Sequence, residues 1–316
     1  MRNIIVTGAT SFIGRHLIEK LLADNNNFIY AVIRRDSSRK EALAKSDNMQ
    51  MIELNMEEYG SLSSAIAESC EICFALAWDG TRGASRNDKA LQQNNYKYSM
   101  ECIKEVCKLG CKKIICSGSQ AEYGDIAEAF KEKLIIEDIE SNPTTEYGIA
   151  KVQFYQEAKE YCTKWGVSII EPRFFSIYGE DDNFQTVILA MLGDMMQDKP
   201  CRLTECIQYW DFLYIDDAVG ALVKLMEQEC VDGIYNVASG DNRRLKDFIE
   251  EMHLITHSKS ELLYGAVPYS SQGGMVSIRP SVEKLKTQTG WYPKVSFEMG
   301  IRRVIDFLQG ENKNEM

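Results

Sequence analysis

The sequence predicts an α/β fold, in which a doubly wound parallel sheet carries a smaller C-terminal α/β cap. Three observations lead to this prediction. Short apolar runs alternate with segments of helical periodicity through the first half of the chain, a glycine-containing turn joins the first run to the first such segment, and the alternation ends after Pro172. Continuous apolar strands that alternate with amphipathic helices form βαβ units, whose parallel sheet is covered by helices on both faces.

The predicted elements follow one another along the chain. In the first half, strands are expected at 4–6, 28–33, 51–54, 72–77, 113–116 and 167–171, and helices at 13–22, 62–69, 95–109 and 145–165. In the second half, strand-like segments at 201–213 and 233–237 lie among helices at 186–196, 218–229, 245–252, 282–290 and 297–308, before a polar tail that we expect to fray. We assign residues 1–173 to the sheet domain and 174–316 mainly to the cap, with segments near 211–238 returning to the sheet.

Composition narrows the classes of partner. Of the 316 residues, 45% are hydrophobic and 26% are charged, and the net charge of −11 argues against a general nucleic-acid binder. No apolar stretch approaches the ~20 residues of a membrane span, so we expect no membrane partner. Ten cysteines without a leader-like apolar run fit a reducing cytoplasm. Cys70 and Cys73 have metal-site spacing, but nothing nearby completes a zinc set, so we interpret them as buried thiols and expect no metal.

A turn rich in small residues, 7–14, separates the first strand from the first helix. Gly8 allows a tight turn and Gly14 allows the helix to pack closely on the strand, which is how a pyrophosphate is brought onto a helix N-terminus. Ser11 stands where glycine is usual, so its side chain must point away or take part in binding. Two glycines alone also suit a plain connection, but the strand before and the amphipathic helix after favour a Rossmann-type dinucleotide site formed with Phe12 and Ile13.

The tip of the second strand carries the signal for the type of dinucleotide. A site specific for NAD places an acid there to bind the ribose 2′-hydroxyl, whereas Ile33, Arg34 and Arg35 occupy this region. Because arginine suits a 2′-phosphate, we favour NADP(H) and keep NAD(H) as possible. Asp36 tempers this preference, and the alternative is that the arginines are simply solvated.

A tyrosine–lysine pair, Tyr147 and Lys151, falls within the long predicted helix. Four residues apart, the two side chains lie on one helix face, and an ammonium near a phenol lowers the pKa of the phenol. Such a tyrosine can exchange a proton with a substrate hydroxyl or carbonyl. Ser119 follows the strand 113–116, where open α/β sheets bind ligands, and its hydroxyl can bind the reacting oxygen. Without this context, the pair could be exposed helical residues and the serine an ordinary loop residue.

Taken together, these residues resemble the extended branch of the short-chain dehydrogenase/reductase superfamily, the NAD-dependent epimerases and dehydratases of nucleotide sugars. The resemblance covers nearly the whole chain. It rests on Thr7-Gly8…Gly14, Leu76-Ala77, Asn95, Ser119 before Tyr123-Gly124, Tyr147…Lys151, Arg173…Tyr178-Gly179, Asp211-Phe212…Asp216-Asp217-Ala218, Tyr235-Asn236-Val237 and Gly290-Trp291-Tyr292-Pro293.

The resemblance implies roles for individual residues. Tyr147 would be the acid/base, Lys151 would lower its pKa and bind the nicotinamide ribose, and Ser119 would orient the sugar oxygen. The remaining cofactor contacts that it implies are Asn55 at the adenine, Met56, Leu76, Ala77, Asn95, Ser117 and Phe174. The substrate contacts that it implies, in addition to Ser119, are Gln120, Ser176 and Arg202, the last of which could equally be an exposed strand residue.

This sequence departs from the family pattern beyond the glycine loop. Ser176 stands where many relatives have asparagine, Trp210 where many have an arginine that binds diphosphate, and Ser270 where a basic residue is usual. The family also often dimerises through the helices that are expected here at 95–109 and 145–165, so we expect a homodimer. Four apolar residues of these helices could equally be ordinary core: Met100, Val106, Cys107 and Phe154.

The reaction is narrowed by the same comparison of residues. Dehydratases usually carry an acidic pair after the catalytic serine, whereas Gln120 and Ala121 stand here, which disfavours dehydration. Epimerases keep a tightly held NAD, and reductases exchange NADPH, which Arg34 and Arg35 favour. Several short sequence motifs, such as Ala77-Trp78-Asp79-Gly80, also resemble those of the 4-keto-6-deoxyhexose reductases of deoxysugar synthesis. Our hypothesis is a 4-ketoreductase of a CDP- or dTDP-linked 4-keto-6-deoxy sugar; the alternatives are a 4-epimerase and a non-catalytic NADP-binding sensor.

Overall fold

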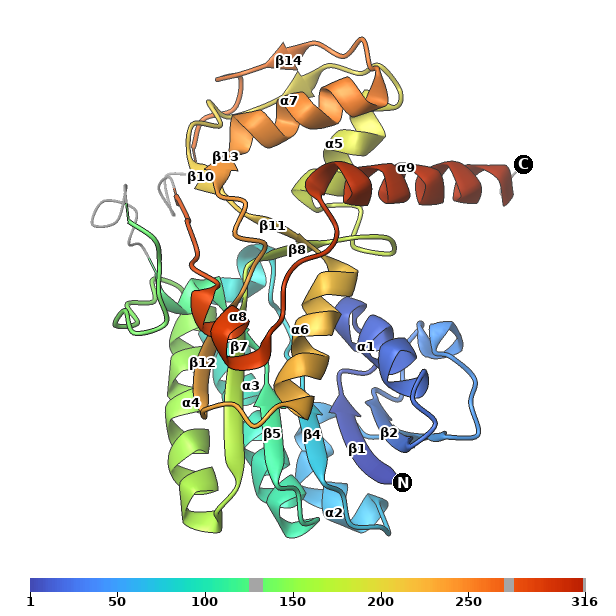
Figure 1. Cartoon of the computed structure of the whole chain (residues 1–316), viewed down its shortest axis with the longest axis vertical. Coiled ribbons are helices and arrows are strands. Elements are labelled where there is room, and N and C mark those ends of the chain that lie inside the picture. The colour runs from blue at the N-terminus through green and yellow to red at the C-terminus, as the bar shows by residue number, and fades with distance from the viewer. Residues whose placement is uncertain (125–132, 270–275, 315–316) are drawn as a thin grey trace.

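A parallel sheet forms the lower part of the molecule as drawn in Figure 1. The computed structural model describes residues 1–124, 133–269 and 276–314. Among these residues, all strand pairings within this sheet are parallel. The strand order is β3 (Met49–Glu53), β2 (Asn27–Ile33), β1 (Arg2–Thr7), β4 (Ile72–Ala75), β5 (Lys113–Cys116), β7 (Ser168–Phe174) and β12 (Gly233–Val237), and β6 (Gly118–Ser119) also pairs with β7.

The chain order of these strands creates the binding crevice. The chain runs from β1 outward to β3 and then returns to place β4 on the other side of β1. This reversal makes the sheet doubly wound, which confirms the fold class that the sequence predicts. Open sheets of this kind bind ligands beyond the carboxyl ends of the strands where the order reverses, here between β1 and β4.

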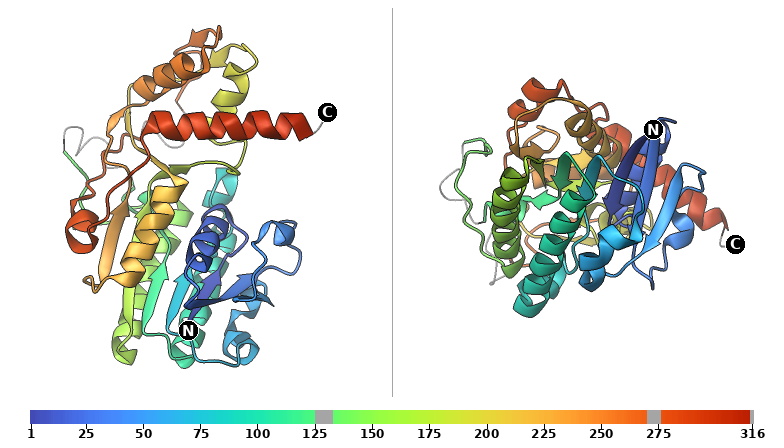
Figure 2. Two further views of the ribbon diagram at one scale, coloured as in Figure 1. Left: turned by 45° about the vertical axis from the view of Figure 1, so that its right-hand side comes forward. Right: turned by 90° about the horizontal axis from the view of Figure 1, so that it is seen from below.

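Helices cover both faces of the sheet (Figures 1 and 2). They are α1 (Phe12–Leu22), α2 (Leu62–Ala65), α3 (Lys89–Lys108), α4 (Glu146–Trp165) and α6 (Ile215–Glu227), joined by the 3-10 turns η1 (Lys40–Ala42), η2 (Met56–Ser61), η3 (Gly83–Asn87) and η4 (Gln120–Glu122). Successive side chains of β1 belong to two hydrophobic cores, one on each face of the sheet. Ile4 and Val6 pack with α1 and α6, and Ile5 packs with α3 and α4. Strand geometry directs successive side chains to opposite faces, which explains the unbroken apolar run.

The cap lies above the sheet in Figure 1 and is built from short elements. Its strands pair only in twos, β8 with β11, β9 with β14 and β10 with β13. The cap elements are β8 (Ser176–Tyr178), α5 (Val187–Met195), β9 (Cys201–Arg202), β10 (Tyr209–Trp210), β11 (Phe212–Tyr214), β13 (Arg243–Arg244), α7 (Leu245–Thr256), β14 (Leu262–Leu263) and α9 (Phe297–Asn314). Helix α8 (Glu283–Thr289) instead packs beside β12 and α6 of the sheet domain. Between cap segments the chain returns to the sheet domain through α6 and β12.

Several boundaries differ from the prediction. The strand expected to close at Pro172 continues to Phe174, because Arg173 and Phe174 pair with β6 and β12. Helix α3 begins several residues before Asn95, where the side chain of Asp88 accepts a hydrogen bond from Leu91 N at 3.1 Å and caps the helix. The segment 201–213, expected as one strand-like run, is split among three two-stranded sheets. The helix expected at 297–308 continues to Asn314.

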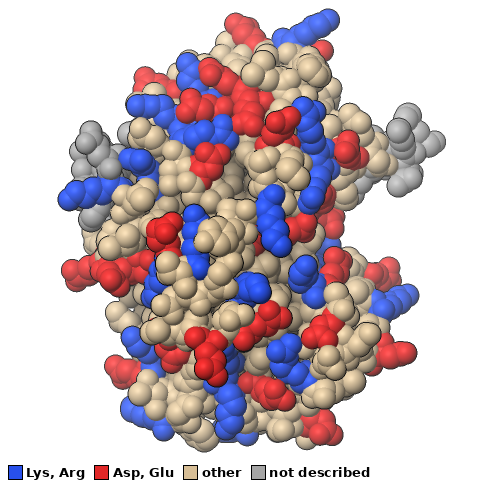
Figure 3. Space-filling model, in the orientation of Figure 1, with Lys and Arg blue, Asp and Glu red and all other residues tan. Residues whose placement is uncertain are grey.

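The distribution of charged residues, the state of the cysteines and the hydropathy of the helices can be compared with the expectations from the sequence. On the face shown in Figure 3, acidic and basic side chains are interspersed. All ten cysteines are free and all but Cys230 are buried. Burial raises the pKa of the Cys70 thiol to about 12, and a hydrogen bond with Cys102 together with burial raises the pKa of Cys73, which agrees with inert thiols. Among the described residues, no helix combines the length and hydropathy needed to cross a membrane.

Candidate dinucleotide and catalytic site

The turn after β1 has the close backbone packing that a phosphate-binding loop requires. Gly8 has a positive φ of 65°, and a Cβ at this position would lie 2.9 Å from Ala77 N. A Cβ at Gly14 would lie 2.3 Å from Gly8 O. Real Cβ atoms do not approach this closely, so both positions need glycine, and the backbone of the turn stays open toward the crevice.

Ser11 is accommodated because its side chain caps the helix. Its backbone is extended, and its Oγ accepts a hydrogen bond from Gly14 N at 3.1 Å, as an N-cap serine does. The hydroxyl therefore stays at the helix end, beside the backbone N–H groups that would face a phosphate. Phe12 and Ile13 direct their side chains to the core cluster, so they could contribute to binding only through their backbone.

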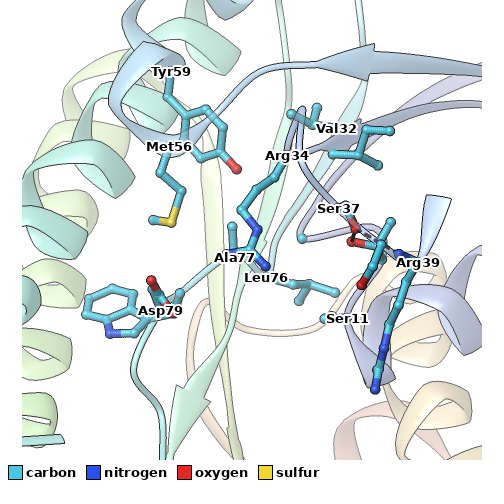
Figure 4. A pocket seen from close by; sticks show the side chains of 15 residues that line it. Ser11, Val32, Arg34, Ser37, Arg39, Met56, Tyr59, Leu76, Ala77 and Asp79 are labelled. Carbon is cyan, nitrogen blue, oxygen red and sulfur yellow. Dashed lines mark hydrogen bonds between the residues drawn. The ribbon is translucent and has the colours of Figure 1, made fainter. Parts of the chain in front are cut away.

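A cavity of about 300 Å³ opens between this turn and the tips of β2 and β4 (Figure 4). Its walls come from four separate segments of the chain that meet at the switch point of the sheet. The lining residues are Gly8, Thr10, Ser11, Val32, Ile33, Arg34, Ser37, Ser38, Arg39, Met56, Tyr59, Leu76, Ala77, Trp78 and Asp79. The predicted residues Gly8, Ser11, Arg34, Met56, Leu76 and Ala77 are thus brought together.

The two arginines at the tip of β2 behave differently. The side chain of Arg34 reaches across the cavity toward Leu76 and Ala77 (Figure 4), and makes no hydrogen bond or ion pair with the residues that the structure describes. Arg35 forms an ion pair with Glu58 and does not line the cavity. Arg39 lines the cavity as a second cation, which sequence reasoning missed, although it lies only five residues after Arg34.

Polar side chains hold the cavity wall on β4. Thr7 Oγ1 accepts hydrogen bonds from Leu76 N at 3.1 Å and Ala77 N at 3.2 Å. The buried side chain of Asn95 donates to Asp79 O at 2.8 Å and accepts from Asp79 N at 3.2 Å. Asn95 thereby fixes the segment that follows Ala77 without lining the cavity. Sequence reasoning did not identify the role of Thr7, since its signal is only a hydroxyl next to the glycine turn.

Asn55, which the resemblance places at the adenine, is engaged in local hydrogen bonds. Its side-chain oxygen accepts from Arg35 N at 3.2 Å, and its side-chain nitrogen donates to Glu57 at 3.3 Å. Asn55 caps η2 and does not line the cavity, whereas the next residue, Met56, does.

The catalytic candidates meet where α4 begins. Thr145 caps this helix by accepting a hydrogen bond from Gly148 N at 3.1 Å. A Cβ on Gly148 would lie 2.5 Å from Ala121 O, so α4 touches the backbone of the turn η4 that follows Ser119. Tyr147 and Lys151 are one helical turn apart, and both are buried. This packing brings the Tyr147 phenol to the hydroxyl of Ser119.

The ammonium of Lys151 is held by the strand end and by an aromatic ring. It donates to Ser117 O at 2.6 Å and Ser117 Oγ at 3.1 Å, and lies 3.9 Å from the centre of the Trp78 ring. Burial lowers the pKa of Lys151 to about 8. Ser117, which was predicted as a cofactor contact, is hydrogen-bonded to Lys151. Trp78 both contacts Lys151 and lines the cavity, so it lies between the catalytic residues and the cavity.

The pKa of Tyr147 moves in the direction opposite to the sequence-based expectation. Burial raises it to about 12, against the hydrogen bond with Ser119 and the charge of Arg86, which lower it. The guanidinium of Arg86 lies 5.1 Å from the centre of the Tyr147 ring, and its Nε is buried without a hydrogen-bond partner in the described chain. Burial of the phenol outweighs these two effects, while Lys151 is engaged with Ser117 and Trp78.

The predicted substrate contacts are distributed over the strand ends and the cap. Gln120 and Ser176 are partly exposed, and Phe174, which was predicted as a cofactor contact, is buried at the end of β7. Arg202 is exposed on β9 and donates to Ala266 O at 3.2 Å. Ser270 lies outside the described residues.

Comparison with known proteins identifies the family. Residues 4–238 match the NAD dependent epimerase/dehydratase family. The chain belongs to this family. It is therefore an NAD(P)-dependent enzyme of the extended short-chain dehydrogenase/reductase class, as the sequence predicts.

The relatives named below are distant, and each matches nearly the whole chain. The chain is 24% identical to UDP-N-acetyl-alpha-D-glucosaminuronate decarboxylase of Bacillus cytotoxicus, over 98% of both chains. It is 25% identical to CDP-abequose synthase of Salmonella muenchen, also over 98% of both. Among solved structures, UDP-glucose 4-epimerase of Thermotoga maritima with UDP-glucose has a TM-score of 0.86 at 24% identity, over 98% of this chain and 99% of that one. This last likeness confirms the fold.

Proposed function

We propose that the protein reduces the C4 keto group of a CDP- or dTDP-linked 4-keto-6-deoxy sugar with exchangeable NADPH, in deoxysugar synthesis. The observation that carries this proposal is the cation of Arg34, which enters the cavity at the tip of β2 where NAD-specific sites place an acid. The similarity to CDP-abequose synthase over 98% of both chains supports the sugar class.

The residues present fit a dinucleotide. Gly8 and Gly14 allow a close packing of the turn that a Cβ at either position would prevent, and Ser11 keeps the end of α1 capped beside it. Arg34, Arg39 and the hydroxyls of Ser37 and Thr10 line the part of the cavity near the tip of β2, and Ser37 Oγ donates to Thr10 Oγ1 at 3.0 Å. Two cations with hydroxyls are the donor set that a 2′-phosphate prefers.

The catalytic residues suit proton donation. NADPH, when bound beside these residues, would supply the hydride. Tyr147, whose pKa is raised to about 12, is protonated at neutral pH and can give its proton to the carbonyl oxygen, so that C=O becomes CH–OH. Ser119 orients that oxygen, and the cations of Lys151 and Arg86 offset the phenolate charge that proton transfer leaves on Tyr147. Removing a hydroxyl proton, which an epimerase must do first, requires the phenolate instead.

The function is tested with a 4-keto-6-deoxy sugar linked to CDP or dTDP. Its incubation with the protein and NADPH is expected to remove the absorbance of the reduced nicotinamide in proportion to the sugar added. The absence of consumption with every ketosugar tested would overturn the proposal. NAD that stays bound through purification would favour the 4-epimerase, and NADP binding without any turnover would favour the sensor.

Replacing Arg34 by glutamine is expected to weaken the binding of NADPH by about 10–100-fold, because a charge-assisted hydrogen bond to the 2′-phosphate contributes about 1.5–3 kcal/mol. The affinity for NADH should change little. Arg35→Gln is the matched control, since Arg35 pairs with Glu58 outside the cavity. Fluorescence titration with both dinucleotides measures the ratio, and equal losses for NADPH and NADH would contradict the role of Arg34.

The rate of ketone reduction is expected to fall as the pH rises through about 8, where Lys151 loses its proton. Below this pH the ammonium is charged and stabilises the phenolate formed at Tyr147; above it the stabilisation is lost. The pH dependence of kcat/KM reports on the free enzyme and measures this limb. A rate that stays constant well above pH 8 would show that the Lys151 charge is not needed.

The proposal extends to assembly as a homodimer through α3 and α4. Met100, Val106 and Phe154 are buried within the single chain, so these residues are core and the interface must use outward side chains. Ile149 and Trp165 of α4 are 42% and 51% exposed and supply apolar surface. Light scattering is expected to give twice the mass of one chain, and a monomer at working concentration would contradict this prediction.

A further inference from the structure

A buried ionic cluster lies behind the catalytic residues, and the proposed reaction does not use it. Glu122 ends the turn η4 that follows Ser119, and Glu171 and Arg173 lie on β7. Each of the three, like Lys151, is at most 2% exposed. Charges buried this deeply cost free energy unless each has a partner. The protonation state of this cluster is therefore set by how its charged groups pair.

The two carboxyl groups converge on one nitrogen of Arg173. Arg173 Nε lies 3.1 Å from Glu122 Oε2 and 3.1 Å from Glu171 Oε2. Nε carries a single hydrogen and cannot donate fully to both oxygens. Nη2 lies 3.0 Å from Glu122 Oε2 and 3.0 Å from Ser141 Oγ, and Nη1 is buried without a hydrogen-bond partner in the described chain. The arginine therefore pairs well with Glu122, and Glu171 is left with a shared hydrogen.

Lys151 does not complete the pairing directly. Its ammonium donates to Ser117 and lies over the Trp78 ring, and the structure gives it no hydrogen bond to either carboxyl group. Two carboxyl groups thus have one hydrogen-bonded cation between them. Two carboxylates that share a site cannot both ionise easily, and one of them holds a proton.

The surrounding backbone has room for this pair and ties it to the catalytic serine. A Cβ on Gly118 would lie 2.7 Å from Glu171 Cγ and 2.9 Å from Arg173 Cγ, so the cluster requires glycine there. Glu122 Oε1 accepts a hydrogen bond from Ser119 N at 2.7 Å. The charge of the pair is thus fixed next to the catalytic turn.

Ionisable groups face the pair from every neighbouring element. They are Arg173 on β7, Tyr147, Lys151 and Tyr155 on α4, Cys116 on β5 and Tyr123 after η4. Burial raises the pKa of Glu122 and, together with the charge of Glu122, raises the pKa of Glu171 well above its ordinary range. The pKa values of Cys116, Tyr123 and Tyr155 are also raised, so these groups are neutral near pH 7.

We propose that Glu122 and Glu171 share one proton, so that the pair carries a single negative charge, and that this charge keeps the nearby ammonium of Lys151 protonated. In this arrangement Glu171 donates its proton to Glu122, and Glu122 accepts from Arg173 and from Ser119 N. Both glutamates are positioning residues, because they act on the reaction through Lys151. The second half of the inference rests on the proposed hydride-transfer function; the shared proton does not.

The test uses Glu122→Gln, Glu171→Gln and the double variant. In either single variant the remaining carboxyl group ionises and preserves the negative charge, so the fall in turnover near pH 8 should stay in place. The double variant removes the charge, and the fall should move to lower pH by about one unit or more, a tenfold change in the proton affinity of Lys151. Carbon-13 NMR titration of the lysine side chains, with Lys151→Met for assignment, follows the same shift without substrate.

Infrared spectroscopy tests the shared proton in the native protein. At neutral pH we expect a protonated-carboxyl band that both Glu122→Gln and Glu171→Gln remove. Glu137→Gln is the matched control, since Glu137 is also buried with a raised pKa but accepts from Asn236 N and, among the described residues, forms no ion pair with Arg173. This control should leave the band component in place.

Two results would overturn the inference. One is a native spectrum without a band component that depends on Glu122 and Glu171. The other is a graded response, in which each single variant shifts the Lys151 titration by half of the shift in the double variant, as two full charges would. Neither readout needs a sugar substrate, so they separate this inference from the proposed reductase function. A native spectrum without any protonated-carboxyl band at neutral pH overturns the inference without the use of a variant.

Discussion

Replacing Tyr147 by phenylalanine is expected to lower turnover by about 10²–10⁴-fold, the range for loss of a positioned general acid. Only the phenol oxygen is removed. The ring keeps its edge contact with Trp78, at 6.2 Å between ring centres, and its place under the Arg86 guanidinium. The fold and the binding of the dinucleotide should therefore be unchanged, because Tyr147 does not line the cavity between β1, β2 and β4.

The matched control for this variant is Tyr161→Phe. Tyr161 lies on the same helix, and its ring stacks on Trp165 at 5.9 Å, away from Ser119. Its loss of a hydroxyl should leave turnover and binding as they are. Steady-state kinetics and titration with NADPH give both quantities. A Tyr147→Phe protein that retains native turnover would contradict the assignment of the acid, and a protein without turnover to lose would point to the sensor.

Replacing Gly14 by alanine is expected to weaken dinucleotide binding by about tenfold or more, which is at least about 1.4 kcal/mol. The new Cβ would lie 2.3 Å from Gly8 O and 3.0 Å from Ala9 O, both of which are backbone atoms of the binding turn. The turn must move away from α1, and the N–H groups at the helix end then no longer face the phosphates. Titration with NADPH and NADH should show similar losses, since both carry the same pyrophosphate.

Gly193→Ala is the matched control for this change. Gly193 lies within helix α5, and a Cβ there meets no atom within 4 Å. Alanine should leave binding unchanged and stabilise the fold by about 0.5–1 kcal/mol, since glycine is unfavourable inside a helix. Thermal unfolding of both variants separates a local effect on the turn from general destabilisation. Native affinity in a folded Gly14→Ala protein would contradict the assignment of the loop.

The sequence predicts the sheet well because buried strands and amphipathic helices leave local patterns. β1, β2 and β5 fall close to the expected positions, since their apolar runs are continuous. The cap is less predictable: the segment 201–213 reads as one strand, but β9, β10 and β11 pair with three partners far away in the sequence. Such pairing depends on tertiary contacts, which no local pattern records.

The site shows the same division between local and long-range information. Tyr147, Lys151 and Gly14 follow from spacing and from their neighbours in sequence. The contacts of Lys151 with Ser117 and Trp78, and of Arg86 with the Tyr147 ring, form only because segments distant in the sequence meet in the fold. The direction of the Tyr147 pKa depends on burial, which the Tyr–Lys spacing does not indicate.

Transfer of deuterium from NADPH labelled at the transferred position of the nicotinamide tests the central claim most directly. With a CDP- or dTDP-linked 4-keto-6-deoxy sugar as acceptor, we expect one deuterium at C4 of the product for each NADP⁺ released into solution. Mass spectrometry of the product and of the free cofactor measures both quantities. A sugar that remains unlabelled while the label stays on the cofactor, or a bound cofactor that never exchanges with solution, would contradict a reductase that uses exchangeable NADPH.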